Sequence, residues 1–151
     1  VAQVRREAQV EHAVALGAAE VVVTDDGEAL DDTEGYRLVV DGIGGPLFGA
    51  AVAKLDADGV AVTYGGTANA NLELSLRTLY AKGRASIRGL NLYAVSSVTP
   101  PATWLPRLLN LARHRRLELD ALHVSSWQEV GAIAQGLLDR TFTGKAVLRV
   151  D

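Results

Sequence analysis

Glycine-rich backbone follows two apolar runs of this sequence, and backbone of this kind lets a ligand approach closely. The runs are residues 36–41 and 59–64, and the glycine-rich stretches are residues 42–45 and 65–66. Because both runs are continuously apolar and rich in Val and Leu, they predict parallel strands covered by helices on both faces. Ligands of open α/β sheets bind at the carboxyl ends of such strands. The pattern therefore favours a nucleotide-binding enzyme.

The elements that must position these stretches alternate between strands and helices. We predict strands at residues 1–4, 20–24, 37–41, 60–64, 86–93 and 145–150, an extended segment at 117–124, and helices at 7–16, 46–55, 101–115 and 127–139. A turn with a short helix is expected within residues 25–35, and residues 72–81 fit either a strand or a helix. This alternation predicts an α/β fold with a doubly wound parallel sheet.

One part of a dinucleotide-binding fold is not found in the sequence. Such a fold opens with a strand, a glycine-rich turn and a helix that receives the pyrophosphate. Gly42 and Gly44 follow a strand, but Leu47 stands at the last glycine position of the G-x-G-x-x-G pattern. The chain opens at Val1 within a strand-like run, which suggests a truncated chain. We then expect unpaired backbone groups beside the absent strand, and a tendency to aggregate or self-associate.

Four segments, taken in order, resemble a known superfamily. They are residues 14–22, 39–45, 59–65 and 144–148. Their order and spacing resemble the medium-chain dehydrogenase/reductase superfamily, and within it the zinc-free quinone oxidoreductase (zeta-crystallin-like) branch, from its second Rossmann strand onward.

The resemblance implies two parts of unequal size. Residues 1–121 would be an incomplete Rossmann-like nucleotide-binding domain, lacking its first strand and glycine-rich turn. Residues 122–151 would be the C-terminal helix–strand segment of a GroES-like catalytic domain that is otherwise absent. The catalytic residues would lie in that absent domain, so the chain alone is expected to be inactive.

Arg5 and Arg6 follow the position that the resemblance gives to the second Rossmann strand. An NAD enzyme places an acidic residue there for the ribose 2′-hydroxyl, whereas two guanidinium groups suit a 2′-phosphate. The cofactor is therefore predicted to be NADPH, although the two arginines could also be ordinary solvated charges. Gln9 stands where many relatives carry a Lys near the same phosphate, which weakens the predicted NADPH preference.

The resemblance assigns further cofactor contacts to strand ends. The adenosine side would be lined by Asp41, Gly42, Ile43 and Gly44, and the nicotinamide would be flanked by Tyr64, Gly65, Gly66, Leu92 and Tyr93. Asp41 could instead be a turn-forming carboxylate, and Tyr93 a half-buried aromatic at an edge or an interface. Arg140 matches an Arg that reaches toward the cofactor phosphate, or it is a cation at a helix C-terminus.

The function implied is hydride transfer from NADPH to a small-molecule quinone or α,β-unsaturated carbonyl. The expected assembly is a homodimer in which residues 85–93 extend the sheet across a two-fold axis. A zinc-dependent alcohol dehydrogenase of the same superfamily, a non-catalytic dimerising α/β binding module and another Rossmann enzyme such as a methyltransferase remain alternatives.

The composition of the chain limits the kinds of partner that it is expected to bind. Fifteen Lys and Arg against eighteen Asp and Glu give a formal net charge of −3, which argues against nucleic acid or an anionic membrane as partner. No apolar run has the length of a membrane span or resembles a signal peptide. The chain has no Cys, and its three His show no ligand spacing, so no metal site is expected and a cytoplasmic location is the default.

Overall fold

The computed structural model describes residues 1–151 except 33–34, 118–121, 140, 142–143 and 151. The chain divides into two compact units, Val1–Pro100 and Pro101–Asp151. Each unit is described by itself.

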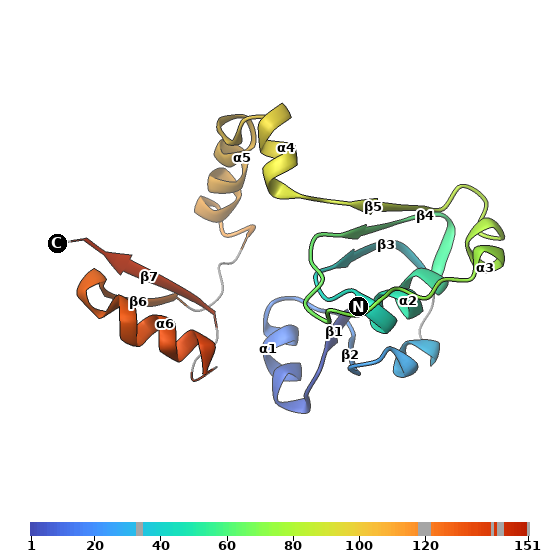
Figure 1. The fold of residues 1–151 in the computed structure, drawn as a ribbon, viewed down its shortest axis with the longest axis horizontal. Helices are drawn as coiled ribbons and strands as arrows, with labels where there is room; N and C mark the ends of the chain where they lie inside the picture. Colours follow the sequence, from blue (N-terminus) through green and yellow to red (C-terminus); the bar gives the residue numbers. More distant parts are fainter. Residues whose placement is uncertain (33–34, 118–121, 140, 142–143, 151) are drawn as a thin grey trace. The chain divides into compact units, whose positions relative to one another are not determined.

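The first unit alternates strands with short helices (Figure 1). Its elements are β1 (Ala2–Val4), α1 (Val10–Ala15), β2 (Val21–Val23), β3 (Tyr36–Asp41), α2 (Gly45–Ala53), β4 (Leu55–Thr63), α3 (Leu76–Tyr80), β5 (Ser86–Gly89) and α4 (Leu92–Val98), with 3-10 turns at Glu7–Gln9 and Glu28–Asp32. Strands β1 and β2 form one parallel sheet, and β3, β4 and β5 form a second parallel sheet in that order. The predicted α/β class with parallel pairing is confirmed.

The core of this unit lies between α2 and the three-stranded sheet. Phe48 and Val52 of α2 are buried with Leu55 and Ala61 of β4, and Val39 of β3 packs against this cluster. Helix α2 can start at Gly45 because Pro46 is favoured in a first turn, where its missing N–H is not needed. The helix and the strands are therefore held together by apolar burial, as their sequence pattern predicts.

Strand β4 is longer than expected, because it begins at Leu55 and not at residue 60. Its first half contains Asp58 in the left-handed region, with φ 63°. The Asp58 carboxylate accepts hydrogen bonds from Arg84 Nε and Nη2, both at 3.1 Å, and from the Arg84 backbone N–H. This fork joins the start of β4 to the segment that leads into β5, and it lowers the pKa of the Asp58 carboxyl.

The strand predicted at residues 86–93 is wrong in its second half. Strand β5 ends at Gly89, and Leu92 and Tyr93 belong to helix α4. The reason is the Asn91 side chain, which accepts a hydrogen bond from the Ala94 N–H at 3.0 Å and caps the helix. The segment expected at a dimer interface is therefore partly strand and partly helix.

The second unit contains α5 (Pro101–Arg113), β6 (Leu122–Ser126), a 3-10 turn at Trp127–Glu129, α6 (Val130–Leu138) and β7 (Lys145–Arg149). Strands β6 and β7 pair in parallel, with α6 between them in the sequence. The helices predicted from residues 101 and 127, and the last strand, are confirmed. Across the described part of the chain, no helix combines the length and the apolar character needed to cross a membrane.

Candidate functional site

The candidate site is the carboxyl edge of the β3–β4–β5 sheet. The register places Asp41 beside Thr63, and Thr63 beside Gly89. Since the three strands are parallel, the loops that follow them leave the sheet at the same edge. The sequence segments 42–45, 64–66 and 90–93 are thereby brought to one place, as ligand sites of open α/β sheets require.

Asp41 organises the first of these loops. The residue is only 8% exposed, and its carboxylate accepts hydrogen bonds from the Ile43 N–H at 3.1 Å and the Gly44 N–H at 2.9 Å. The Thr63 hydroxyl lies 3.1 Å from Asp41 Oδ2 and donates to it. This geometry is that of the turn-forming carboxylate considered for Asp41 from the sequence. Because its oxygens already accept these hydrogen bonds, the carboxylate holds the turn in place.

The glycines of the first loop are needed for its shape. Gly44 has φ 77° and ψ −161°, and Gly45 has φ 62°, which are conformations that side chains rarely adopt. A Cβ at Gly42 would lie 2.9 Å from the Tyr64 hydroxyl oxygen, so the Tyr64 ring packs directly against this backbone. The loop therefore leaves room at Gly42 for the aromatic ring of Tyr64.

The second loop, after β4, is tied to the first by backbone contacts. The Tyr64 N–H donates to the Asp41 carbonyl at 2.8 Å, and the Ala68 N–H donates to the Ile43 carbonyl at 2.9 Å. A Cβ at Gly65 would lie 2.5 Å from the Gly42 carbonyl oxygen, whereas one at Gly66 would meet nothing within 4 Å. The structure thus brings together Asp41, Gly42, Ile43 and Gly44 with Tyr64, Gly65 and Gly66.

Thr63 is the residue of this corner that sequence reasoning missed. Its hydroxyl links the two strand ends, since it contacts Asp41 Oδ2 at 3.1 Å and the Gly65 carbonyl at 3.0 Å. The only signal for Thr63 in the sequence is a hydroxyl residue at the end of a strand, shortly before two glycines. This combination is common. The pairing with Asp41 depends on the register of β3 with β4, which the sequence does not encode locally.

Arg5, Arg6 and Gln9 form a group at the end of β1. The Gln9 side-chain oxygen accepts the N–H groups of Arg5 and Arg6, both at 3.1 Å, so it shapes the turn that leads into α1. Both arginines are exposed. Exposed guanidinium groups on a shaped turn are chemically able to bind a phosphate.

Three predicted residues are not part of these two loops. Leu92 and Tyr93 start helix α4, just beyond the carboxyl end of β5, with Tyr93 87% exposed. Arg140 lies outside the described residues.

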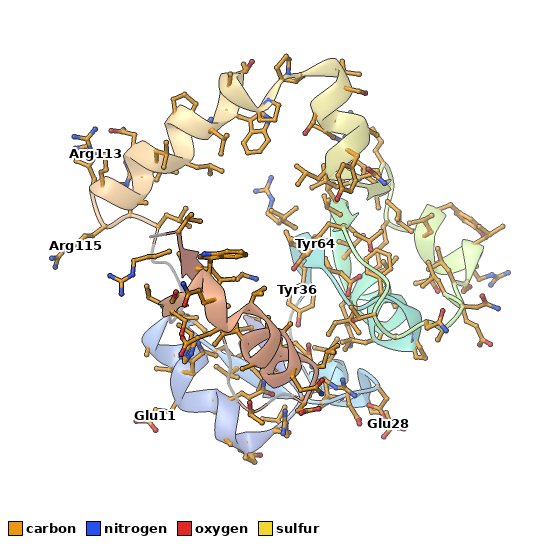
Figure 2. All side chains as sticks on the ribbon, turned by 60° about the vertical axis from the view of Figure 1, so that its left-hand side comes forward. Glu11, Glu28, Tyr36, Tyr64, Arg113 and Arg115 are labelled. Atoms are coloured by element: carbon orange, nitrogen blue, oxygen red, sulfur yellow. The ribbon has the colours of Figure 1, made fainter. Side chains whose placement is uncertain are left out.

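A cavity of about 460 Å³ adjoins the corner inside the first unit. It is lined by β1, by β3 and the start of its loop, and by Tyr64. Tyr36 and Tyr64, labelled in Figure 2, lie on its wall, and Leu30, Leu47 and Ala51 supply apolar surface. The cavity therefore joins the polar corner at Asp41 to an apolar groove between two strands.

No group of three or more His, Cys, Asp or Glu residues is placed to hold a metal ion among the residues that the structure describes. The corner as described offers backbone and aromatic groups, and the turn after β1 carries two exposed guanidinium groups.

The fold and the corner together define a Rossmann-like α/β unit with its ligand edge at the carboxyl ends of β3, β4 and β5. No family model matches the sequence, and no curated protein matches it. Solved structures do match the fold, with identities of 16 to 20% in the three described next.

A mycobacterial quinone oxidoreductase has a TM-score of 0.79 at 20% identity, over 97% of this chain and 47% of its own. Benzyl alcohol dehydrogenase from Acinetobacter calcoaceticus has a TM-score of 0.78 at 18% identity, over 99% of this chain and 42% of its own. The Escherichia coli K-12 protein YHDH, solved with bound NADPH, has a TM-score of 0.71 at 16% identity, over 99% of this chain and 46% of its own.

The chain spans less than half the length of each of these proteins. At such identities the likeness establishes the fold. The predicted Rossmann-like architecture is therefore confirmed for the part of these three proteins that this chain matches.

Proposed function

We propose that this chain is the cofactor-binding part of an NADPH-dependent oxidoreductase that reduces a quinone or an α,β-unsaturated carbonyl. The observation that carries the proposal is the corner at Asp41. There, two glycine-rich loops are fastened to each other at the carboxyl edge of a parallel sheet. The proteins named above include a quinone oxidoreductase and a structure with NADPH bound, which supports this cofactor and this reaction class.

The corner suits the uncharged parts of a dinucleotide better than its phosphates. The N–H groups of Ile43 and Gly44 are already used by the Asp41 carboxylate, so they do not form an anion cradle. What remains is the open backbone at Gly66, where a Cβ would meet nothing within 4 Å, together with the Tyr64 ring. A ribose or a planar ring could lie against this wall. Leu92 and Tyr93, after the next strand end, would complete this wall on the nicotinamide side.

The arginines at the end of β1 are proposed to select the cofactor. Charge-assisted hydrogen bonds from Arg5 and Arg6 would favour the 2′-phosphate of NADPH. Gln9 supports them indirectly, because its side chain holds the two backbone N–H groups of their turn. Arg140 is proposed as a further contact to the cofactor phosphate.

The bound NADPH supplies the hydride, so the protein's part is to align the nicotinamide with the acceptor and to exclude water. No catalytic residue is assigned within residues 1–151. We propose that residues 122–151 pack on a catalytic domain that also sets acceptor specificity, with residues 1–121 as the cofactor domain.

Two alternatives keep some support. The likeness to benzyl alcohol dehydrogenase favours a zinc-dependent alcohol dehydrogenase as second candidate, with its metal ligands outside this chain. A non-catalytic α/β binding module is the other. Arg5 and Arg6 favour the reductase over both.

We also infer a homodimer that uses the open edge of β5 and the start of α4. Strand β5 pairs only with β4 among the described strands. Leu92, Tyr93 and Val98 of α4 are 58%, 87% and 84% exposed, so an apolar surface continues from this edge. In an isologous contact, both protomers would bury this apolar surface against each other.

The test is a titration of the ¹⁵N-labelled chain with NADPH and, separately, with NADH. We expect NADPH to shift the amide resonances of Gly42, Gly65 and Gly66. The double variant Arg5→Ala/Arg6→Ala should bind NADPH about 10- to 100-fold more weakly and NADH almost unchanged, as loss of contacts to a charged group predicts.

The matched control is Arg113→Ala/Arg115→Ala, which removes two exposed arginines from the second unit. It should leave both affinities unchanged. Binding of neither nucleotide would contradict the proposed function. Equal loss for NADPH and NADH would remove the argument for a 2′-phosphate site.

A further inference from the structure

The hydroxyl of Thr63 lies between two hydrogen-bond acceptors. Thr63 Oγ1 is 3.1 Å from Asp41 Oδ2 and 3.0 Å from the Gly65 carbonyl oxygen. A hydroxyl carries one proton, and neither the carboxylate nor the carbonyl can donate in return. The two acceptors therefore share a single donor.

The two acceptors depend on this donor to different degrees. The Asp41 carboxylate also accepts the N–H groups of Ile43 and Gly44, at 3.1 and 2.9 Å. For the Gly65 carbonyl, the Thr63 hydroxyl is the one donor that the described part of the chain supplies. Loss of the hydroxyl would therefore leave the turn at Asp41 in place but release the Gly65 carbonyl.

The peptide group that joins Gly65 to Gly66 lies between two fixed points of its loop. Before it, the Tyr64 N–H donates to the Asp41 carbonyl at 2.8 Å. After it, the Gly66 carbonyl accepts the Asn69 N–H at 3.0 Å. The plane between these points can still rotate as a unit, because such a rotation changes only the ψ before it and the φ after it.

Glycine on both sides lets this rotation occur at little cost. Gly66 is not among the glycines with positive φ, so its φ is negative. A flip of the plane turns this φ by about half a turn, to a positive value that glycine adopts readily and other residues avoid. The C=O and N–H of a trans peptide point in opposite directions, so the flip exchanges the sides that the Gly65 carbonyl and the Gly66 N–H face.

We propose that Thr63 is a positioning residue that holds the Gly65–Gly66 peptide in one orientation. The carbonyl points to the Thr63 hydroxyl at the strand end, and the Gly66 N–H is held on the opposite side. An N–H recognises an acceptor atom and a carbonyl recognises a donor, so this orientation decides which kind of ligand atom the loop can bind. That the ligand is a nicotinamide cofactor rests on the proposed function.

The orientation is tested on the whole 151-residue chain without nucleotide. Thr63→Val removes the hydroxyl, and we expect ¹⁵N relaxation dispersion to show microsecond-to-millisecond exchange at the Gly66 amide that wild type lacks. Thr63→Ala should behave in the same way. Thr63→Ser keeps the hydroxyl and should show no exchange.

Thr67→Val is the matched control. It removes a second hydroxyl from the same loop, one that lies 3.4 Å from the Gly42 carbonyl and not beside the Gly65–Gly66 peptide. The Gly66 amide should stay free of exchange in this variant. The same exchange as in Thr63→Val would contradict a specific role of Thr63.

A second substitution separates a peptide flip from a general loosening of the corner. Ala at position 66 disfavours the positive φ that the flip needs, and its Cβ would meet no atom within 4 Å in the present orientation. Thr63→Val/Gly66→Ala should therefore lose the exchange that Thr63→Val shows. A loosening of the turn at Asp41 would not be reversed by a methyl group at position 66.

Nucleotide titrations then test the consequence for binding. Thr63→Val should weaken NADPH and NADH by the same factor, about 2- to 10-fold, as the loss of one neutral hydrogen bond predicts. The variant Arg5→Ala/Arg6→Ala is expected to weaken NADPH alone, so the two roles can be told apart. If wild type binds neither nucleotide, the proposed function fails, and the exchange measurements still decide the role of Thr63.

Three results would overturn the inference. The first is a folded Thr63→Val chain whose Gly66 amide shows no more exchange than wild type. The second is exchange in Thr63→Val that persists unchanged in Thr63→Val/Gly66→Ala. The third is an unchanged affinity of Thr63→Val for a nucleotide that wild type binds.

Discussion

At the scale of single residues, Asp41 shows how a charged side chain can shape a loop through hydrogen bonds within its own turn. Its carboxylate accepts hydrogen bonds from the N–H groups of its own turn and from the Thr63 hydroxyl. The type of turn could be predicted from the sequence Asp-Gly-x-Gly, because short carboxylates form such turns. The Thr63 partner could not, since it depends on which residue of β4 stands beside Asp41.

Gly65 and Gly66 provide a matched pair of substitutions at this corner. Gly65→Ala places a Cβ 2.5 Å from the Gly42 carbonyl oxygen, a backbone atom that cannot move aside easily. We expect the free energy of unfolding to fall by about 1–3 kcal/mol, as overpacking usually does. Gly66→Ala meets no atom within 4 Å and should change it by less than about 0.5 kcal/mol. Urea denaturation measures both, and equal effects would show that the two loops are not in close contact.

At the scale of elements, the sequence predicts best where the apolar pattern has a clear period and a clear start. The helix after Pro101, the helix between Gly45 and Ala53, and the last strand all meet this condition. The region after Gly89 does not. An apolar segment with Leu92 and Tyr93 fits a strand as well as a helix, and one Asn91 side chain decides between them.

The Asp58–Arg84 fork, which joins β4 to the segment before β5, should give a specific dependence of stability on pH. The pKa of Asp58 is lowered in the folded chain by the Arg84 hydrogen bonds. Its contribution is therefore complete above the unfolded pKa, about 3.9, and is lost as pH falls through the lower folded value. Wild type should exceed Asp58→Asn in urea midpoint above about pH 5, and the difference should shrink below about pH 4.

Asn is the appropriate replacement, because it tolerates the φ of 63° at this position. Arg84→Gln should give the same profile, and adding it to Asp58→Asn should have little further effect. A difference that persists unchanged at low pH would mean that the fork is not its source.

At the scale of the molecule, the sequence predicts the fold class but not how the strands divide into sheets. Alternating elements predict parallel pairing, and the described strands pair in this way. They form separate sheets of two, three and two strands, because pairing between distant strands is decided by tertiary contacts and not by local pattern. Among the described strands, β1 pairs only with β2, and β3 pairs only with β4.

The proposed homodimer can be tested at this scale by sedimentation velocity. Tyr93→Asp introduces a charge on the exposed start of α4, and we expect the dimer to dissociate at least about tenfold more readily because apolar interface cores exclude charges. Leu138→Asp, at a residue 77% exposed in the second unit, is the control and should leave association unchanged. A chain that stays monomeric at all concentrations, or a Tyr93→Asp variant that associates like wild type, would contradict the proposed interface.

The bonded aspartates of the first unit also bear on how the protein ages. The chain has three Asp–Gly pairs, beginning at Asp26, Asp41 and Asp58. Such pairs are prone to isoaspartate formation, in which the glycine nitrogen attacks the side-chain carboxyl. Each of these carboxylates is instead held in hydrogen bonds, which restrict the rotation that the attack needs. Isoaspartate should therefore accumulate in this chain only after the turns have unfolded, so that its content in stored protein records the history of unfolding.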